Sequence, residues 1–119
     1  MTKRFPVVVF HNPSCGTSRG VIELIEAAGL KPTIIEYLKT GWTKPQLLAL
    51  FAAANLTPRE ALRENANEAE ELGLLGTHVS DAKILGAMVA HPILVNRPIV
   101  ATPKGVRLCR PKEKGRELL

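Results

Sequence analysis

The 119-residue chain carries a net charge of +5, with 45% hydrophobic and 23% charged residues. This balance is typical of one soluble globular domain and excludes a disordered or fibrous chain, and no stretch approaches the ~18 apolar residues that span a bilayer. The basic excess favours an anionic partner, but three Phe, one Tyr and one Trp, all scattered, argue against a nucleic-acid surface.

The cysteine content and the N-terminus indicate the compartment. Cys15 and Cys109 lie far apart in the sequence and form neither a disulfide framework nor a metal-binding spacing. The N-terminus, MTKRFPVVVFHNP, has basic residues before a short apolar run, but no small-residue cleavage site follows. We therefore expect a cytoplasmic protein with reduced thiols, which needs no metal, bound cofactor, membrane or nucleic acid.

The first third of the chain has the pattern of a strand, a helix and a second strand. Residues 7–10 (VVVF) predict a buried strand, and residues 18–29 carry apolar side chains at helical spacing before the stop signal Gly29. Residues 32–38 are rich in β-branched side chains and predict a strand. A unit of this length and order indicates a parallel crossover.

Three capped helical patterns follow, at residues 43–55, 57–65 and 80–90. Within residues 97–111, two short apolar runs surround a Pro–Lys–Gly turn, which predicts a β-hairpin, and a terminal helix is expected after it. The predicted fold class is α/β, with a βαβ…ββ core and a helical insertion over about residues 43–90.

The stretch HNPSCGTSRG, residues 11–20, places Cys15 where the first strand turns into the first helix. Ligands usually bind at the carboxyl end of a parallel strand, and a helix N-terminus presents free N–H groups. A thiol there should have a pKa below the free value of about 8.5, and its thiolate is a good leaving group. His11 is interpreted either as a stabiliser of the thiolate or as a structural residue, and Arg19 either as an anion ligand or as a solvated side chain.

Cys15 and Ser18 have the spacing of a redox C-x-x-C pair with serine in the second place. A single thiol cannot close its own disulfide, so a redox reaction needs a second thiol, either Cys109 or an external one such as glutathione. The C-x3-R spacing from Cys15 to Arg19 departs from the C-x5-R phosphate loop of tyrosine phosphatases.

Three motifs together give a more specific indication. HNPSCGTSR, HPILVNRPIV (91–100) and TPKGVRLCRP (102–111) resemble the glutaredoxin-coupled arsenate reductase family in order and spacing over nearly the whole chain. The resemblance implies one thioredoxin-like domain over residues 1–119 with a helical insertion. It also implies that Cys15 is the nucleophile and that His11 helps to lower its pKa.

The same resemblance implies an anion-binding triad of Arg63, Arg97 and Arg110, and it matches Pro98 with the proline that is cis in thioredoxin-like folds. Arginine suits such a triad because its planar fork fits tetrahedral oxyanions and its charge offsets the repulsion between a thiolate and the substrate. The implied activity is reduction of arsenate to arsenite, with glutathione as cosubstrate and glutaredoxin as a further electron donor.

Two alternatives remain open. The first is a glutathione-dependent thiol oxidoreductase without arsenate activity, against which the complete arginine set argues. The second is a redox-responsive regulatory binding module, because a related branch binds RNA polymerase and senses oxidation with a C-x-x-C pair. Ser18 removes that switch.

Overall fold

The computed structural model describes residues 5–119. The basic residues at positions 3 and 4, which precede the short apolar run of the N-terminus, lie outside this range. The described chain forms two compact units, one made of residues 5–37 with 97–119 and the other of residues 38–96. Each unit is described by itself.

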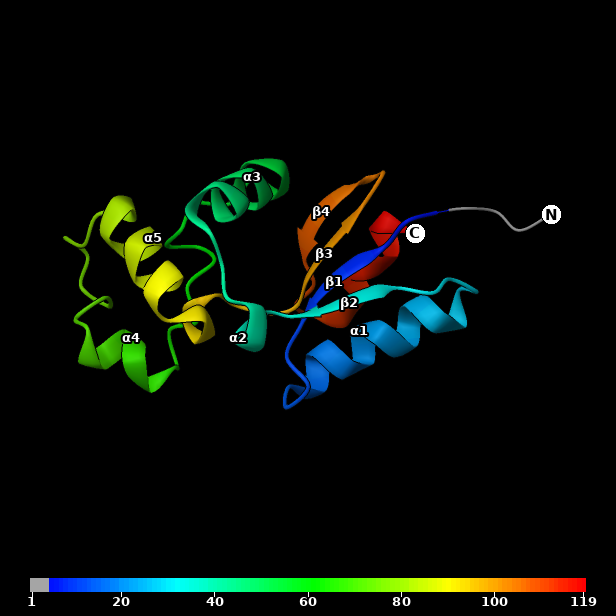
Figure 1. Ribbon diagram of the computed structural model, residues 1–119, viewed down its shortest axis with the longest axis horizontal. Helices are drawn as coiled ribbons and strands as arrows, with labels where there is room; N and C mark the ends of the chain where they lie inside the picture. The colour runs from blue at the N-terminus through cyan, green and yellow to red at the C-terminus, as the bar shows by residue number, and fades with distance from the viewer. Residues whose placement is uncertain (1–4) are drawn as a thin grey trace. The chain divides into compact units, whose positions relative to one another are not determined.

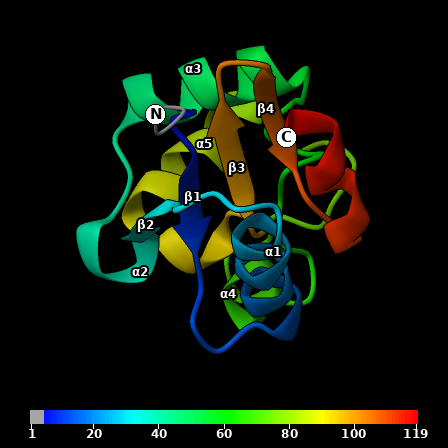
Figure 2. The ribbon, with the colours of Figure 1, turned by 90° about the vertical axis from the view of Figure 1, so that its right-hand side faces the viewer.

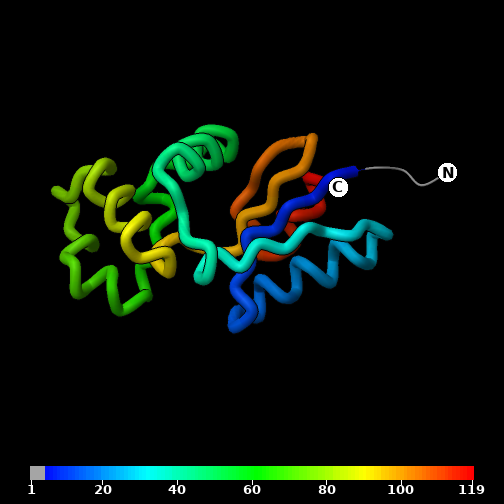
Figure 3. The backbone as a smooth tube through the Cα atoms, in the orientation of Figure 1, coloured from blue at the N-terminus to red at the C-terminus, as the bar shows by residue number. Residues whose placement is uncertain are grey.

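The first unit is built on a four-stranded sheet in the order β2-β1-β3-β4 (Figure 1). Its strands are β1 (Val8–His11), β2 (Thr33–Glu36), β3 (Ile99–Thr102) and β4 (Gly105–Leu108). Strands β1 and β2 are parallel and lie side by side in the backbone trace of Figure 3, although helix α1 (Gly16–Ala27) separates them in sequence. Strand β3 pairs antiparallel with both β1 and β4. The predicted parallel crossover and β-hairpin are therefore confirmed.

One face of this sheet carries the core of the first unit. Helix α1 and the C-terminal 3-10 helix η2 (Lys112–Leu118) pack against each other over it, as Figure 2 shows. The buried cluster takes residues from the strands, from α1 and from η2; it consists of Val7, Val9, Val21, Ile25, Val100, Cys109 and Leu118. The predicted terminal helix thus exists in a 3-10 form, and it closes the core that α1 alone leaves open.

The second unit is helical. It contains α3 (Lys44–Ala54), α4 (Asn67–Glu71), α5 (Asp81–Ala90) and the 3-10 helix η1 (Pro92–Leu94), and α2 (Tyr37–Thr40) leads into it. Helix α3 begins with a capping box, in which Thr43 Oγ1 accepts the N–H of Gln46 and the Gln46 side chain accepts the N–H of Thr43. Ser80 caps α5 with its Oγ, which accepts the N–H of Lys83. The helices predicted at 43–55 and 80–90 are confirmed.

The helix predicted over residues 57–65 is wrong. Thr57 and Glu60 form the expected reciprocal hydrogen bonds, but the chain makes only a turn there. The following backbone pairs with a distant segment instead: Leu62 bridges Val95, and the N–H of Asn96 donates to the carbonyl of Ala61. Tertiary pairing thus takes the backbone groups that a helix would need.

One boundary and one element differ further from the prediction. Strand β2 ends at Glu36 rather than at residue 38, because Tyr37 and Leu38 belong to α2. Helix α4 was not predicted from the sequence, and its five residues are too few for a clear helical period.

Candidate active site

Cys15 lies at the N-cap of α1, directly after a tight turn. The side-chain Oδ1 of Asn12 accepts the N–H of Ser14 at 3.0 Å, and the carbonyl of Asn12 accepts the N–H of Cys15 at 3.0 Å. These bonds close the turn, so that α1 begins at Gly16, two residues before the predicted start. Cys15 is therefore the first residue beside the free N–H groups of the helix.

The Cys15 thiol is surrounded by donors and cations. Nη1 of Arg110 lies 3.5 Å from Sγ. Burial is the largest single influence and raises the pKa of the thiol, but the N–H of Ser18, the Arg110 guanidinium, the charge of Arg97 and the N–H of Thr17 together outweigh it. The pKa of Cys15 consequently lies below its ordinary value. Because these N–H groups lower the pKa, they stabilise the thiolate rather than the neutral thiol.

Arg97 and Arg110 form a hydrogen bond with each other, and both act on Cys15. Nη1 of Arg110 donates to the carbonyl of Arg97 at 3.0 Å, which fixes the guanidinium beside Sγ. Arg97 itself is buried, next to Pro98 at the start of β3. The Arg97–Pro98 peptide bond is cis, as the resemblance implied, and so is the bond between Arg110 and Pro111. The first unit thus brings both arginines of its two motifs to the cysteine.

His11 and Ser18 form a buried pair behind the turn. Nδ1 of His11 lies 2.6 Å from Oγ of Ser18, which also accepts the N–H of Asn12 at 3.1 Å. Burial is the largest influence on His11 and lowers its pKa below the ordinary value, with Arg19 acting in the same direction and Glu36 against it. A histidine of this kind is neutral at pH 7 and carries no positive charge for a thiolate.

Arg19 fits neither of its two sequence interpretations fully. Its side chain is exposed, but Nη1 donates to the carbonyl of Pro13 at 2.8 Å. The side chain therefore spans the turn that precedes Cys15. The N–H groups that the sequence predicts to act on the thiol from the start of the helix belong to Ser18 and Thr17.

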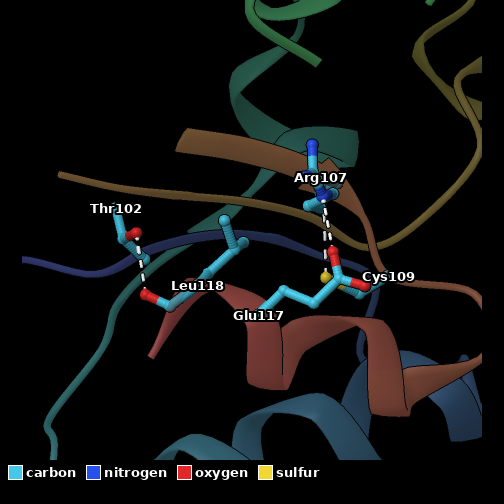
Figure 4. A network of polar contacts seen from close by, with 5 residues as sticks. All are labelled: Thr102, Arg107, Cys109, Glu117 and Leu118. Carbon is cyan, nitrogen blue, oxygen red and sulfur yellow. Dashed lines mark hydrogen bonds and ion pairs between the residues drawn. The ribbon is translucent and has the colours of Figure 1, made fainter. Parts of the chain in front are cut away.

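Cys109, the other cysteine, lies in a different environment. Its side chain is fully buried in the core cluster, and its Sγ contacts the carbonyl of Arg107 at 3.7 Å (Figure 4). Burial raises the pKa of Cys109 to about 12. Thiols with such a high pKa stay protonated and are poor nucleophiles, so Cys109 is chemically unlike Cys15.

Arg63, the third predicted arginine, belongs to the second unit. Its backbone N–H donates to the carbonyl of Leu94 at 2.8 Å, which places it at the end of the turn that replaced the predicted helix. Its membership of the anion-binding triad stays a prediction.

Across residues 5–119, the side chains of His, Cys, Asp and Glu form no group that could hold a metal ion. Over the same range, no helix has both the length and the apolar character needed to cross a membrane. The described site itself offers a stabilised thiolate beside two arginines.

The topology and the placement of the cysteine define a class of protein: a thioredoxin-like fold with a single activated thiol at the first strand–helix turn. The model of the ArsC family matches residues 10–118, and the chain belongs to that family.

Similar proteins have names in agreement with this assignment. An arsenate reductase of Synechocystis is 67% identical over 113 residues, which are 95% of this chain and 81% of the relative. The arsenate reductase of Escherichia coli K12 is 47% identical, with 95% and 80% covered. The structure of an arsenate reductase from Vibrio cholerae superimposes with a TM-score of 0.92 at 35% identity and covers 98% of this chain and 100% of that one.

Proposed function

We propose that the protein reduces arsenate to arsenite with Cys15 as the nucleophile, glutathione as cosubstrate and glutaredoxin as a further electron donor. The observation that carries this proposal is the Cys15 thiol at the start of α1, with Arg110 3.5 Å from Sγ and a lowered pKa. The family and the names of its similar members supply the substrate.

The electron balance requires thiols from outside the chain. The Cys15 thiolate forms a sulfur–arsenic bond and displaces one oxygen of arsenate, which leaves as water after protonation. Glutathione then forms a second sulfur–arsenic bond and displaces another oxygen, which leaves as water. A thiol of glutathione or glutaredoxin attacks the sulfur of this bound glutathione, so that a disulfide forms and the electron pair of the broken sulfur–arsenic bond stays on arsenic. Water finally hydrolyses the bond between Cys15 and arsenic, which releases arsenite and restores the free thiol.

The core of the proposed oxyanion site is Arg97 and Arg110, which offset the charge repulsion between thiolate and arsenate. Arg63 is proposed as the third arginine because the resemblance to the family implies it. The unit of residues 38–96 corresponds to the helical insertion, and we propose that residues 1–119 work as one thioredoxin-like domain. His11, Ser18, Arg19 and Pro98 support the site without contacting arsenate.

The proposed chemistry is tested with a matched pair of variants, Cys15→Ala and Cys109→Ala, each of which removes one sulfur atom. The assay follows NADPH oxidation by glutathione reductase in the presence of arsenate, glutathione and glutaredoxin. We expect Cys15→Ala to abolish arsenate-dependent oxidation and Cys109→Ala to retain most of it. Omission of glutathione should stop the wild-type reaction as well.

The same assay separates the alternatives. A thiol oxidoreductase without arsenate activity would reduce a glutathione mixed disulfide and give no arsenate-dependent signal. A regulatory module would give neither signal. Loss of activity in a folded Cys109→Ala variant, together with loss of an internal disulfide, would make Cys109 the resolving thiol, against its burial and high pKa.

A further inference from the structure

The Ser18 hydroxyl connects three parts of the cysteine turn. Ser18 is the third residue of α1 and is fully buried. Its Oγ lies 2.6 Å from Nδ1 of His11, the last residue of β1, and accepts the N–H of Asn12 at 3.1 Å. One hydroxyl thus ties the start of the helix to the end of the strand and to the intervening turn.

The proton count decides how the pair is arranged. A serine hydroxyl has one proton to donate and two lone pairs to accept with, and the Asn12 N–H uses one of the lone pairs. If His11 donated through Nδ1, the hydroxyl proton would need another acceptor. Among the described residues, Oγ contacts only Nδ1 of His11 and the N–H of Asn12, so no other acceptor is in reach. If the hydroxyl donates to Nδ1, both Nδ1 and the hydroxyl proton have a partner, and the imidazole is neutral with its proton on Nε2.

The charged groups around His11 agree with a neutral ring. Glu36 lies opposite His11 in the parallel pairing of β1 with β2 and favours the protonated form. Burial is the larger influence, and together with Arg19 on α1 it favours the neutral form. The balance keeps the pKa of His11 below its ordinary value.

We infer that His11 is a positioning residue which, as a neutral acceptor of the Ser18 hydroxyl proton, holds the first turn of α1 so that its N–H groups face Sγ of Cys15. The inference rests on the proposed role of Cys15 as nucleophile. It specifies how His11 lowers the pKa of Cys15, which the resemblance leaves open. The backbone N–H of Ser18 belongs to the residue that His11 holds, and it is the strongest of the influences that lower the pKa of Cys15.

The inference also gives Ser18 a second task. Serine at this position prevents a local disulfide, and its hydroxyl also supplies the donor that a cysteine thiol would supply only weakly. The residue that makes the site a single-thiol site therefore helps to keep that thiol ionised.

A set of four variants tests the inference: His11→Ala, Ser18→Ala, the double variant and His11→Asn, all in a Cys109→Ala background. The measurement is the rate of Cys15 alkylation by iodoacetamide as a function of pH. We expect each alanine variant to move the profile to higher pH, and the double variant to move it no further than either single one. His11→Asn, a neutral residue able to accept the Ser18 hydroxyl proton near the Nδ1 position, should recover most of the shift.

A histidine that acted by charge would give the opposite pattern. His11→Asn would then shift the profile as far as His11→Ala, and the effects of His11→Ala and Ser18→Ala would add. Either result would overturn the inference. Circular dichroism identifies variants that fail to fold. If a variant fails to fold, the NMR measurement on the wild-type protein described next still tests the inference.

In the wild-type protein, nitrogen-15 NMR of the histidine ring should show Nδ1 of His11 unprotonated and Nε2 protonated from pH 7 to pH 8. A protonated Nδ1 or an imidazolium at pH 7 would overturn the inference without any variant. Neither measurement contains arsenate, so a failure of arsenate reduction leaves both results intact, and a failed inference leaves the proposed activity intact.

Discussion

Nη1 of Arg110 lies 3.5 Å from Sγ of Cys15, although 95 positions separate the two residues in the sequence. The same nitrogen donates to the carbonyl of Arg97 at 3.0 Å, so the backbone holds the guanidinium in place. A fixed cation beside a thiol favours the thiolate over the neutral form. The contact therefore connects the last of the three motifs directly to the first.

Replacement of Arg110 tests this contact. Since Arg110 lowers the pKa of Cys15, Arg110→Ala should raise that pKa and move the alkylation profile to higher pH. The kcat/KM for arsenate should fall about 10²-fold, as for the loss of one fixed donor to a reacting anion. Arg110→Lys keeps the charge without the planar fork, so its kcat/KM should lie between those of wild type and Arg110→Ala. An unchanged profile in Arg110→Ala would show that the contact does not act on the thiol.

The lowered pKa of Cys15 also predicts how reactivity and stability depend on pH. Alkylation of Cys15 should reach half its maximal rate below pH ~8.5, the midpoint of a free cysteine. Because the folded state gives up this proton more readily than the unfolded state, the thiolate stabilises the fold above the ordinary pKa. That contribution is lost as the pH falls through the folded pKa. Denaturation of wild type and Cys15→Ala at several pH values should show this difference.

Cys109 predicts the opposite dependence. Its pKa is raised to about 12, so between pH ~8.5 and 12 the unfolded chain loses a proton that the folded chain keeps. Stability should fall with rising pH in this window, by up to about 1.4 kcal/mol per pH unit. Cys109→Ala should lack this slope, while all other titrating groups stay the same in both proteins. Urea denaturation at pH 8 and pH 10 measures how the free energy of unfolding changes with pH. An equal change in wild type and in Cys109→Ala would contradict the raised pKa of a buried thiol.

The two connections between η2 and the hairpin should differ in strength. Both are drawn in Figure 4: Arg107 Nε donates to Glu117 at 3.0 Å, and Thr102 Oγ1 donates to the carbonyl of Leu118 at 3.0 Å. The ion pair is exposed, at 45% and 59% of its side chains, so Glu117→Gln should cost less than about 0.5 kcal/mol. Thr102→Val leaves a carbonyl without its donor and should cost about 1 kcal/mol. Urea denaturation of the two variants measures the difference, and a reversed order would contradict it.

Two glycines offer a matched prediction about α1. A Cβ at Gly20 would lie 3.0 Å from Cδ of Lys112, whose flexible side chain can move, so Gly20→Ala should stabilise the protein by about 0.5 kcal/mol through helix propensity. Gly29, just after α1, has φ +80°, and Gly29→Ala should destabilise it by about 1 kcal/mol. The midpoints of urea denaturation should therefore move in opposite directions. A loss of stability in Gly20→Ala would mean that Lys112 is held in place.

Local patterns predicted those elements whose stabilising interactions lie within a few residues. The capping residues Thr43 and Ser80 identified α3 and α5, and the Pro–Lys–Gly turn identified the hairpin. The stretch at 57–65 has the same kind of cap at Thr57 and still forms a turn, because Leu62 pairs with Val95. A local cap permits a helix, but a distant partner can offer the same backbone groups a better arrangement.

By itself, the sequence determined the position of Cys15 at a strand–helix turn, the absence of a local second thiol and the family motifs that carry the arginines. Only the tertiary structure decided which groups act on that thiol: Arg110 from the end of the hairpin, and the N–H groups at the start of α1. It also decided that Cys109 is buried in the core, where burial raises its pKa. The reason is physical, since protonation depends on desolvation and on nearby donors, and both are set by which distant segments meet in the fold.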